Sequence, residues 1–262
     1  AMRIRDPQPQ MTVEHERRNQ TIFKALWEKG SATYESHPTS RHRRRFALKS
    51  LAGESLSGES FVFDYGCGSV VLLEHAAVRY GLPEHRLGGC DITESAIQLA
   101  RTRLNTDYLY VGKFPELEIP CNVIFCTEVI EHTPDYRAIL EWTYAHLAPG
   151  GLLVLTTPGT PMDPPDVEYG HVQHFDLPPL VTDLEKIGFA IETARRWGFP
   201  FFTVQKFITK LFYQQIRKHV IESDMGILKR TVFELLYRVY FVHDFIPAGP
   251  QILIRARKPE QA

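Results

Sequence analysis

The sequence predicts an α/β fold built on a doubly wound, mostly parallel sheet. Residues 61–68 read as a short apolar strand that ends on Asp64 and then on two glycines, Gly66 and Gly68. Apolar runs and helix-like segments then alternate up to residue 155, which is typical of a parallel sheet. Because nucleotide-like ligands bind at the carboxyl ends of such strands, the glycine turn is a candidate binding site.

The segment before this sheet is predicted to be helical. Residues 13–29 carry apolar side chains at helical spacing among charged ones, and residues 40–51 predict a second, strongly basic helix. We expect residues 13–55 to form a helical cap on a single domain of residues 13–262. Residues 1–12, rich in proline, glutamine and arginine, are expected to form a flexible tail.

The remaining elements follow in order along the chain. Further strands are expected at residues 86–91, near 110, and at 122–127, 151–157, 190–197 and 251–257, with helices at 94–101, 135–147 and 177–187. Gly188 is expected to end the last of these helices. Residues 199–245 form an aromatic-rich, helical insertion before the last strand. It is expected either to pack as core or as a dimer face, or to form a lid over the substrate.

Composition favours one globular domain with an ample core, because 44% of the 262 residues are hydrophobic and 23% are charged. The net charge of −1 predicts no overall field that would attract nucleic acid or a membrane. No signal peptide or bilayer-spanning apolar run is recognised. The four cysteines form no CxxC pair and predict buried, reduced thiols in a cytoplasmic protein. They are Cys67, Cys90, Cys121 and Cys126.

A second acid, Asp91, ends the second predicted strand, 23 positions after Gly68. With it the chain resembles the class I S-adenosylmethionine-dependent methyltransferases, whose motifs are an acid-x-Gly-x-Gly turn and an acid that binds ribose. Residues 122–132 resemble that family's fourth strand and the loop after it, and residues 147–158 its Pro-Gly-Gly turn into strand five. The resemblance covers roughly residues 62–189. It implies a Rossmann-like sheet of seven strands and S-adenosylmethionine as the methyl donor.

The resemblance also implies which residues contact the methyl donor. They are Asp64, Gly66, Cys67, Gly68, Asp91, Ile92, Lys113, Phe114, Thr127 and Glu128. Two departures from the family pattern stand out. Ser69 or Val70 replaces a third glycine, and Lys113 follows strand three where the family often has an acid that contacts adenine. Since a charged lysine accepts no hydrogen bond, we expect adenine to rest on apolar surface or to bond backbone groups.

The most unusual cluster is formed by Glu128, Glu131 and His132, which would share one face of a helical turn. Two carboxylates and an imidazole this close favour a divalent cation between them. A histidine pair, His171 and His174, follows strand five. We expect Glu128, Glu131, His132 and His171 to be ligands of Mg²⁺, Mn²⁺ or Zn²⁺. The structural alternative is that Glu131 pairs with an arginine and that His132 is a satisfied core histidine.

The cluster resembles the Glu-x-x-Glu-His segment of the ubiquinone-biosynthesis O-methyltransferases, the group closest in motif. It also resembles that of the small-RNA 3′-terminal 2′-O-methyltransferases. In both groups the segment is associated with a divalent metal near the acceptor hydroxyl. The catalytic candidates, as base or ligand, are therefore His132, His171, His174 and Glu128.

We therefore expect a biosynthetic enzyme that methylates a small-molecule acceptor, above all at a hydroxyl of an aromatic, sugar or lipid-like compound. One alternative is RNA 2′-O-methylation, suggested by the basic run at residues 41–45. Such a run is more often a solvated helix face, and nucleic acid is not expected as a partner. A second alternative is a non-catalytic protein that binds S-adenosylmethionine. A homodimer is left open.

Overall fold

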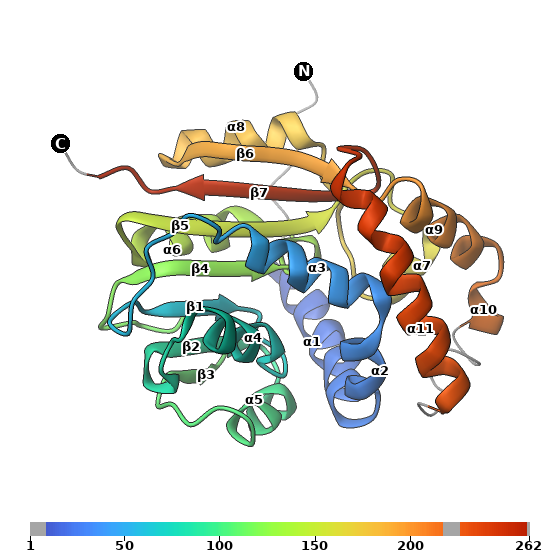
Figure 1. Cartoon of the computed structure of the whole chain (residues 1–262), viewed down its shortest axis with the longest axis horizontal. Coiled ribbons are helices and arrows are strands. Elements are labelled where there is room, and N and C mark those ends of the chain that lie inside the picture. The colour runs from blue at the N-terminus through green and yellow to red at the C-terminus, as the bar shows by residue number, and fades with distance from the viewer. Residues whose placement is uncertain (1–8, 217–225, 261–262) are drawn as a thin grey trace.

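The computed structural model describes residues 9–216 and 226–260, and a seven-stranded sheet forms its centre (Figure 1). The strand order is β3-β2-β1-β4-β5-β7-β6, with β1 to β5 parallel and β7 antiparallel to both of its neighbours. The predicted fold class is confirmed. The strands are β1 Val62–Tyr65, β2 Leu87–Asp91, β3 Leu109–Val111, β4 Cys121–Thr127, β5 Leu147–Pro158, β6 Ala190–Trp197 and β7 Gln251–Arg257.

Helices cover both faces of the sheet because its strands carry apolar side chains on both sides. Val62 of β1 belongs to one buried cluster and its neighbour Phe63 to the other. The first cluster includes side chains of α3 Pro38–Lys49, α4 Val71–Tyr80 and α5 Glu94–Arg101, and the second those of α6 Tyr136–His146 and α8 Leu177–Ile187. Gly188 ends α8 with a left-handed φ of 117°, as predicted.

The strand order reverses at β1, which pairs with β2 on one side and β4 on the other. In parallel sheets this arrangement opens a crevice at the carboxyl ends of the strands. The N-terminal helices lie beside this edge (Figure 1): α1 Pro9–Ala25, the π-helical turn η1 Leu26–Gly30, and α2 Ser31–Ser36. The first helix begins at Pro9 rather than residue 13, so residues 9–12 belong to it. Residues 1–8 of the expected tail lie outside the described residues.

The insertion is helical, as predicted, and is held against α3 by ion pairs. Asp244 contacts Arg45, and Glu234 lies 2.7 Å from the Nη1 atom of Arg41. His42 between them is fully buried. The expectation of a solvated basic face at residues 41–45 is therefore wrong, because the insertion covers it. Its described elements are α9 Phe201–Leu211, α10 Tyr213–Ile216, α11 Ile227–Val239 and the 3₁₀ turn η5 Tyr240–Asp244.

The four cysteines are buried and none forms a disulfide, in agreement with the sequence. A membrane-spanning helix is absent from the described part of the chain, whose helices are too short or too polar to cross a bilayer.

Gly89 in β2 provides a test of how tightly the sheet packs under the glycine turn. A Cβ at this position would lie 2.6 Å from the Cβ of Cys67. We expect Gly89→Ala to lower the free energy of unfolding by about 1–3 kcal/mol, because overpacking forces the turn to shift. Urea denaturation measures this. Gly58→Ala, with open space around its Cβ, is the matched control. Equal unfolding midpoints for the two variants would contradict the packing described here.

Candidate active site

A cavity of about 1070 Å³ lies at the carboxyl edge of the sheet. Its walls come from the N-terminal helices, the glycine turn after β1, the loops after β2, β4 and β5, and the inner side of α9. Two groups of residues lie in it. The glycine end consists of Asp64, Gly66, Gly68 and Asp91, and the histidine end consists of Glu131, His132 and His171. One space thus connects the two sites that the sequence predicts.

The glycine turn has a backbone that only glycine accommodates well. Gly66 and Gly68 have left-handed φ values of 79° and 51°. The N–H group of Gly66 donates to the carbonyl of Cys90 at 2.8 Å, which ties the turn to β2. A Cβ on Gly68 would lie 2.4 Å from the ring of Trp27. An aromatic ring from the N-terminal segment therefore rests directly on the turn.

Two acids, the buried Asp64 and the partly buried Asp91, lie near each other at the glycine end. Asp64 is buried, and its Oδ1 meets no hydrogen-bond donor among the described residues. Burial, with a contribution from Asp91, raises the pKa of Asp64 well above its usual range. Asp91 accepts bonds from the N–H groups of Gly68 at 3.2 Å and Thr93 at 2.9 Å. The Thr93 hydroxyl also donates to Asp91 at 2.8 Å rather than capping α5, the role its position suggests.

The other residues expected to contact the methyl donor divide into two groups. Cys67, Ile92, Thr127 and Lys113 line the cavity. The ammonium group of Lys113 is held 2.7 Å from Glu16 of α1, so this lysine joins the cap to the loop after β3. Phe114 is not brought to the cavity: its side chain is 48% exposed, and its ring centre lies 6.5 Å from that of Tyr65.

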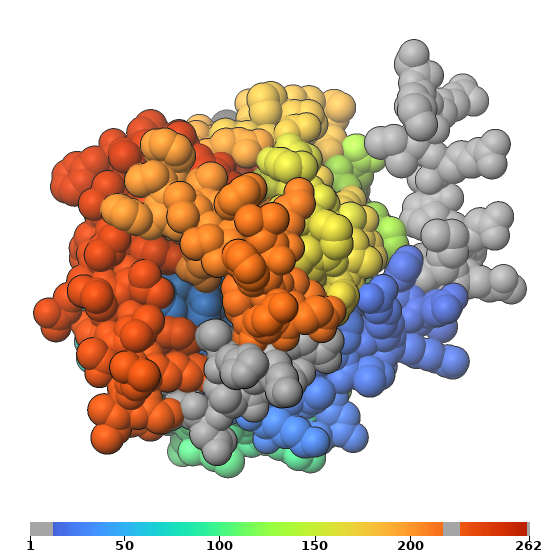
Figure 2. Space-filling model, turned by 90° about the vertical axis from the view of Figure 1, so that its right-hand side faces the viewer, coloured from blue at the N-terminus to red at the C-terminus, as the bar shows by residue number. Residues whose placement is uncertain are grey.

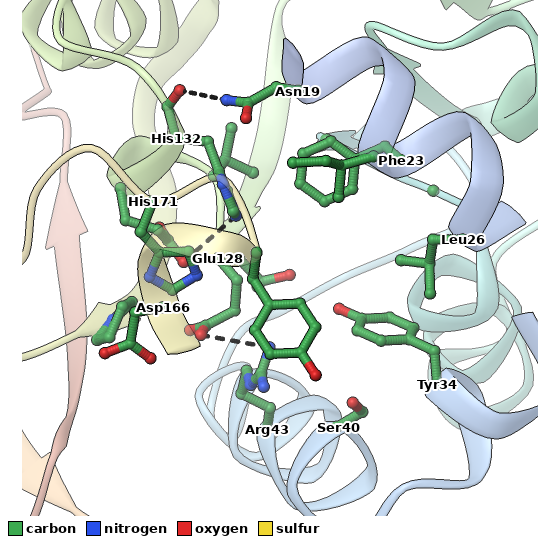
Figure 3. A pocket seen from close by; sticks show the side chains of 18 of the residues that line it. Asn19, Phe23, Leu26, Tyr34, Ser40, Arg43, Glu128, His132, Asp166 and His171 are labelled. Carbon is green, nitrogen blue, oxygen red and sulfur yellow. Dashed lines mark hydrogen bonds and ion pairs between the residues drawn. The ribbon is translucent and has the colours of Figure 1, made fainter. Parts of the chain in front are cut away.

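The fully buried Glu131 and the largely buried His132 form the centre of the histidine end, and Figure 3 shows His132 there beside His171. The Thr157 hydroxyl donates to Oε2 of Glu131 at 3.0 Å, while Oε1 meets no donor among the described residues. Burial and the nearby Glu128 raise the pKa of Glu131 well above its usual range. The ring of His132 lies perpendicular to that of His171, with 4.6 Å between centres.

Glu128 does not share a helical face with Glu131 and His132, so that expectation is wrong. The helical turn covers only Ile130–His132, and Glu128 precedes it with a left-handed φ of 58°. Its carboxylate instead accepts from the Thr156 hydroxyl at 2.9 Å and lies 3.3 Å from the Nη1 atom of Arg43 (Figure 3). A left-handed non-glycine residue is strained and is held only by such contacts.

His171 and His174 form a directed hydrogen-bond chain. Nδ1 of His171 lies 2.7 Å from Nε2 of His174, whose Nδ1 lies 3.3 Å from the carbonyl oxygen of Pro161. Because a carbonyl only accepts, His174 carries its proton on Nδ1, and His171 donates from its own Nδ1. This assignment follows from the network. Nε2 of His171 therefore keeps a free lone pair.

Burial keeps these imidazoles neutral. It lowers the pKa of His132 to about 4 and that of His171 to about 2, and also lowers the pKa of His174. Ligand atoms of Glu131, His132 and His171 lie within 4.8 Å of one another. A second group has the same spacing: ligand atoms of Asp166, His171 and His174 also lie within 4.8 Å of one another. Asp166 belongs to α7 Pro164–Glu168. Neutral imidazoles beside a carboxylate are a donor set that divalent metals accept.

Several residues of the cavity were missed from the sequence. The side-chain amide of Asn19 donates to the carbonyl of His132 at 2.7 Å, and the ring of Phe23 packs edge-on against His132. Trp27, Tyr34 and Arg43 complete this wall. The N-terminal pattern indicated helices but not which part of the sheet they would cover, so no signal connected these positions with the site.

Comparison with known proteins identifies the family. Residues 39–194 match the model of a methyltransferase domain, so the chain belongs to that family, and the class I resemblance is confirmed. A trans-aconitate 2-methyltransferase of Paracidovorax citrulli is 28% identical over 131 residues, 47% of this chain and 48% of that protein. A ubiquinone biosynthesis O-methyltransferase of Actinobacillus pleuropneumoniae is 32% identical over 108 residues, 37% of this chain and 44% of that protein. The chain thus spans about half the length of these curated relatives.

Solved structures share the fold. A chain in the complex of the Haloferax volcanii Trm112 methyltransferase activator with a methyltransferase has a TM-score of 0.60 at 16% identity, covering 93% of this chain and 98% of its own. The geranyl diphosphate C-methyltransferase of Streptomyces coelicolor, solved with Mg²⁺ and S-adenosyl-L-homocysteine, has a TM-score of 0.56 at 15% identity, covering 84% and 77%. At these identities the likeness shows the fold alone.

The buried His132 predicts a pH dependence of stability. The unfolded chain takes up a proton near pH 6.5 and the folded site only near pH 4, so stability falls as the pH drops between these values. Between pH 7 and pH 5 this single group costs about 2 kcal/mol. We expect His132→Gln to reduce the loss by that amount in urea denaturation with EDTA present. The exposed His85→Gln is the control. An unchanged pH dependence in His132→Gln would contradict the assignment.

Proposed function

We propose that this chain is an S-adenosylmethionine-dependent methyltransferase that methylates a hydroxyl of a small-molecule acceptor. The observation that carries the proposal is the single cavity that joins the glycine end to the histidine end. The names of the curated relatives, which include ubiquinone biosynthesis O-methyltransferases, support methylation of a small molecule.

The glycine end fits the methyl donor. Oδ1 of Asp64 lacks a donor among the described residues, and an ammonium group would supply one. One lone pair on Oδ2 of Asp91 accepts a hydrogen bond from the N–H of Gly68, and the other would accept one from a ribose hydroxyl. Glycine at positions 66 and 68 gives the turn its left-handed backbone, and Val129 and Trp27 pack where a Cβ would lie. When bound, S-adenosylmethionine supplies an electrophilic methyl carbon on a sulfonium sulfur.

The histidine end would align the acceptor and remove its proton. We propose Nε2 of His171 as the proton acceptor, because the hydrogen bond to His174 leaves its lone pair free. Burial makes this imidazole a weak base, so the proton moves to it only as the positive charge of the sulfonium is lost in the transfer. His174 is then a positioning residue. The acceptor oxygen forms its bond to the methyl carbon as the carbon–sulfur bond breaks in line, and the hydroxyl proton passes to the imidazole. The products are a neutral thioether and a protonated imidazole, so the positive charge of the sulfonium ends on the imidazole.

A divalent cation is an alternative to His171 as the proton acceptor, because the one free lone pair on Nε2 of His171 cannot bind a cation and take up the proton at the same time. Glu131, His132 and His171 would hold it, and the fit rests on the buried Oε1 of Glu131, which has no donor among the described residues. Glu128, expected as a fourth ligand, is engaged by Arg43 instead. A bound cation would lower the pKa of the acceptor hydroxyl, and Glu131 would then be ionised.

The alternative of RNA methylation has less support. Besides the resemblance of residues 128–132, it relied on a free basic run at residues 41–45 for contact with RNA, yet Arg41, Arg43 and Arg45 form ion pairs within the protein. The other alternative, a non-catalytic protein that binds S-adenosylmethionine, is separated from the proposal by an assay of turnover.

Binding of the donor is tested first by titration calorimetry with S-adenosylmethionine. We expect Asp91→Ala to weaken binding about 10- to 100-fold, because a charge-assisted bond to the ribose is lost. Glu94→Ala, an exposed acid on α5, should leave the affinity unchanged. Failure of the native chain to bind S-adenosylmethionine would refute the proposal.

Turnover is tested by transfer of a labelled methyl group to a panel of phenols, carboxylic acids, sugars and short RNAs, with Mn²⁺ or with EDTA. We expect His171→Ala to lower turnover at least about 100-fold while donor affinity stays the same. His85→Gln is the control. Labelling of RNA alone would favour the RNA alternative, and equal rates with Mn²⁺ and EDTA would remove the metal from the proposal.

A further inference from the structure

Gln251, the first residue of β7, places a buried amide at the wall of the cavity. The residue is only 4% exposed, and its Oε1 atom meets no donor among the described residues. A buried acceptor without a donor is costly, so a native fold keeps such a group where water or a ligand supplies the bond. Because this amide lies at a cavity rather than in the core, a bound molecule can supply the missing donor.

Gln251 lies on the side of the cavity that holds the histidine end. It pairs with Pro158 at the end of β5, and the residue before, Thr157, donates to the carboxylate of Glu131. His171 follows in the segment between β5 and α8. By contrast, β4 and β5 separate β7 from β1 and its glycine turn, a distance of three strand spacings or about 14 Å. Gln251 therefore belongs to the part of the cavity where the acceptor would bind, away from the methyl donor's ribose and ammonium groups.

The helix α9 forms an outer wall of the cavity, and Figure 2 shows it, in orange, at the surface of the molecule. It begins beside Gln251. Trp197 pairs with Gln251 across β6 and β7, and the ring of Trp197 stacks on that of Phe202 with 6.0 Å between centres. Phe202 itself lines the cavity. An acceptor in this part of the cavity would therefore contact both an aromatic side chain and the Oε1 atom of Gln251.

Gln205 and Lys206 of α9 also line the cavity, but both already have partners within the protein. The Tyr240 hydroxyl donates to Oε1 of Gln205. The ammonium group of Lys206 lies 3.1 Å from a carboxylate oxygen of Asp166, which offsets its charge. The Oε1 atom of Gln251 differs from these groups, because the fold supplies it with no donor among the described residues. An uncharged amide oxygen suits an uncharged donor, a hydroxyl or an amide N–H.

We propose that Gln251 determines which acceptors bind: its Oε1 accepts a hydrogen bond from a second hydroxyl or an amide N–H of the acceptor, besides the hydroxyl that is methylated. An acceptor without this second donor would displace water from Oε1 and leave the atom without a bond, so it would bind more weakly. A site that hydrogen-bonds a substrate group rejects analogues without that group far more strongly than an apolar pocket does. The inference rests on the proposed function and extends it to an acceptor with two donors.

Matched pairs of small phenols test this role with the full chain. The pairs are dihydroxybenzenes with their monomethyl ethers, and 4-hydroxybenzamide with its N,N-dimethyl form, so that the members differ in donors. Dissociation constants are measured by ligand-observed NMR, with and without S-adenosylhomocysteine. In at least one pair we expect the native chain to bind the member with the second donor at least about tenfold more tightly. Gln251→Met, similar in size but without a strong acceptor, should lose this preference. Gln98→Met, at an exposed glutamine of α5, is the matched control and should keep it.

Two outcomes would overturn the role of Gln251: equal or absent binding of both members of every pair by the native chain, or the same preference in the native chain and in Gln251→Met. Urea denaturation establishes that the variant folds, and Gln251→Leu replaces it if it does not. The affinity for S-adenosylhomocysteine should be the same in native chain and variant, because Gln251 lies away from the glycine end. The assay measures binding without turnover. Its failure is therefore distinct from a failure of the proposed methyl transfer, which calorimetry with the donor and methyl labelling test separately.

Discussion

The helix α3 and its arginines connect the parts of this molecule. Arg41 and Arg45, four residues apart, lie on one side of the helix and pair with the acids of the insertion. Arg43, midway between them, points the other way and pairs with Glu128 at the end of β4. The helix therefore joins the insertion to the edge of the sheet, and the cavity walls depend on it. The Arg43 and Arg45 pairs are largely buried, so removal of one partner would leave an uncompensated buried charge.

The cavity contains buried polar groups that lower the stability of the fold when no ligand is bound. The carboxyl groups of Asp64 and Glu131 each have one oxygen without a donor among the described residues, and burial raises both pKa values. The imidazoles of His132 and His171 are kept neutral by the same burial. An ammonium group at one end and a cation or a hydroxyl at the other would supply what these groups lack. Such a site sacrifices stability for binding, as functional sites commonly do.

The sequence predicted the sheet well and the surroundings of the site poorly. Strands, the glycine turn and the end of α8 at Gly188 were found because each depends on neighbouring residues. The prediction that Glu128 shares a helical face with Glu131 and His132 is wrong, because Glu128 has a left-handed backbone. This conformation is rare for a non-glycine residue, and no sequence pattern indicates it. The basic run at residues 41–45 was read as solvated because nothing local shows that the insertion, almost two hundred residues later, covers it.

The sequence by itself determined the fold class, the edge at which the motifs meet and the family resemblance, because strand periodicity, glycine turns and motif order are local properties of the chain. Only the tertiary structure decided that Arg43 engages Glu128, that Asn19 and Phe23 hold His132, and that the insertion turns its polar side inward. Those contacts join residues far apart in the sequence. They depend on how the helices pack over the sheet, and no local sequence pattern predicts this packing.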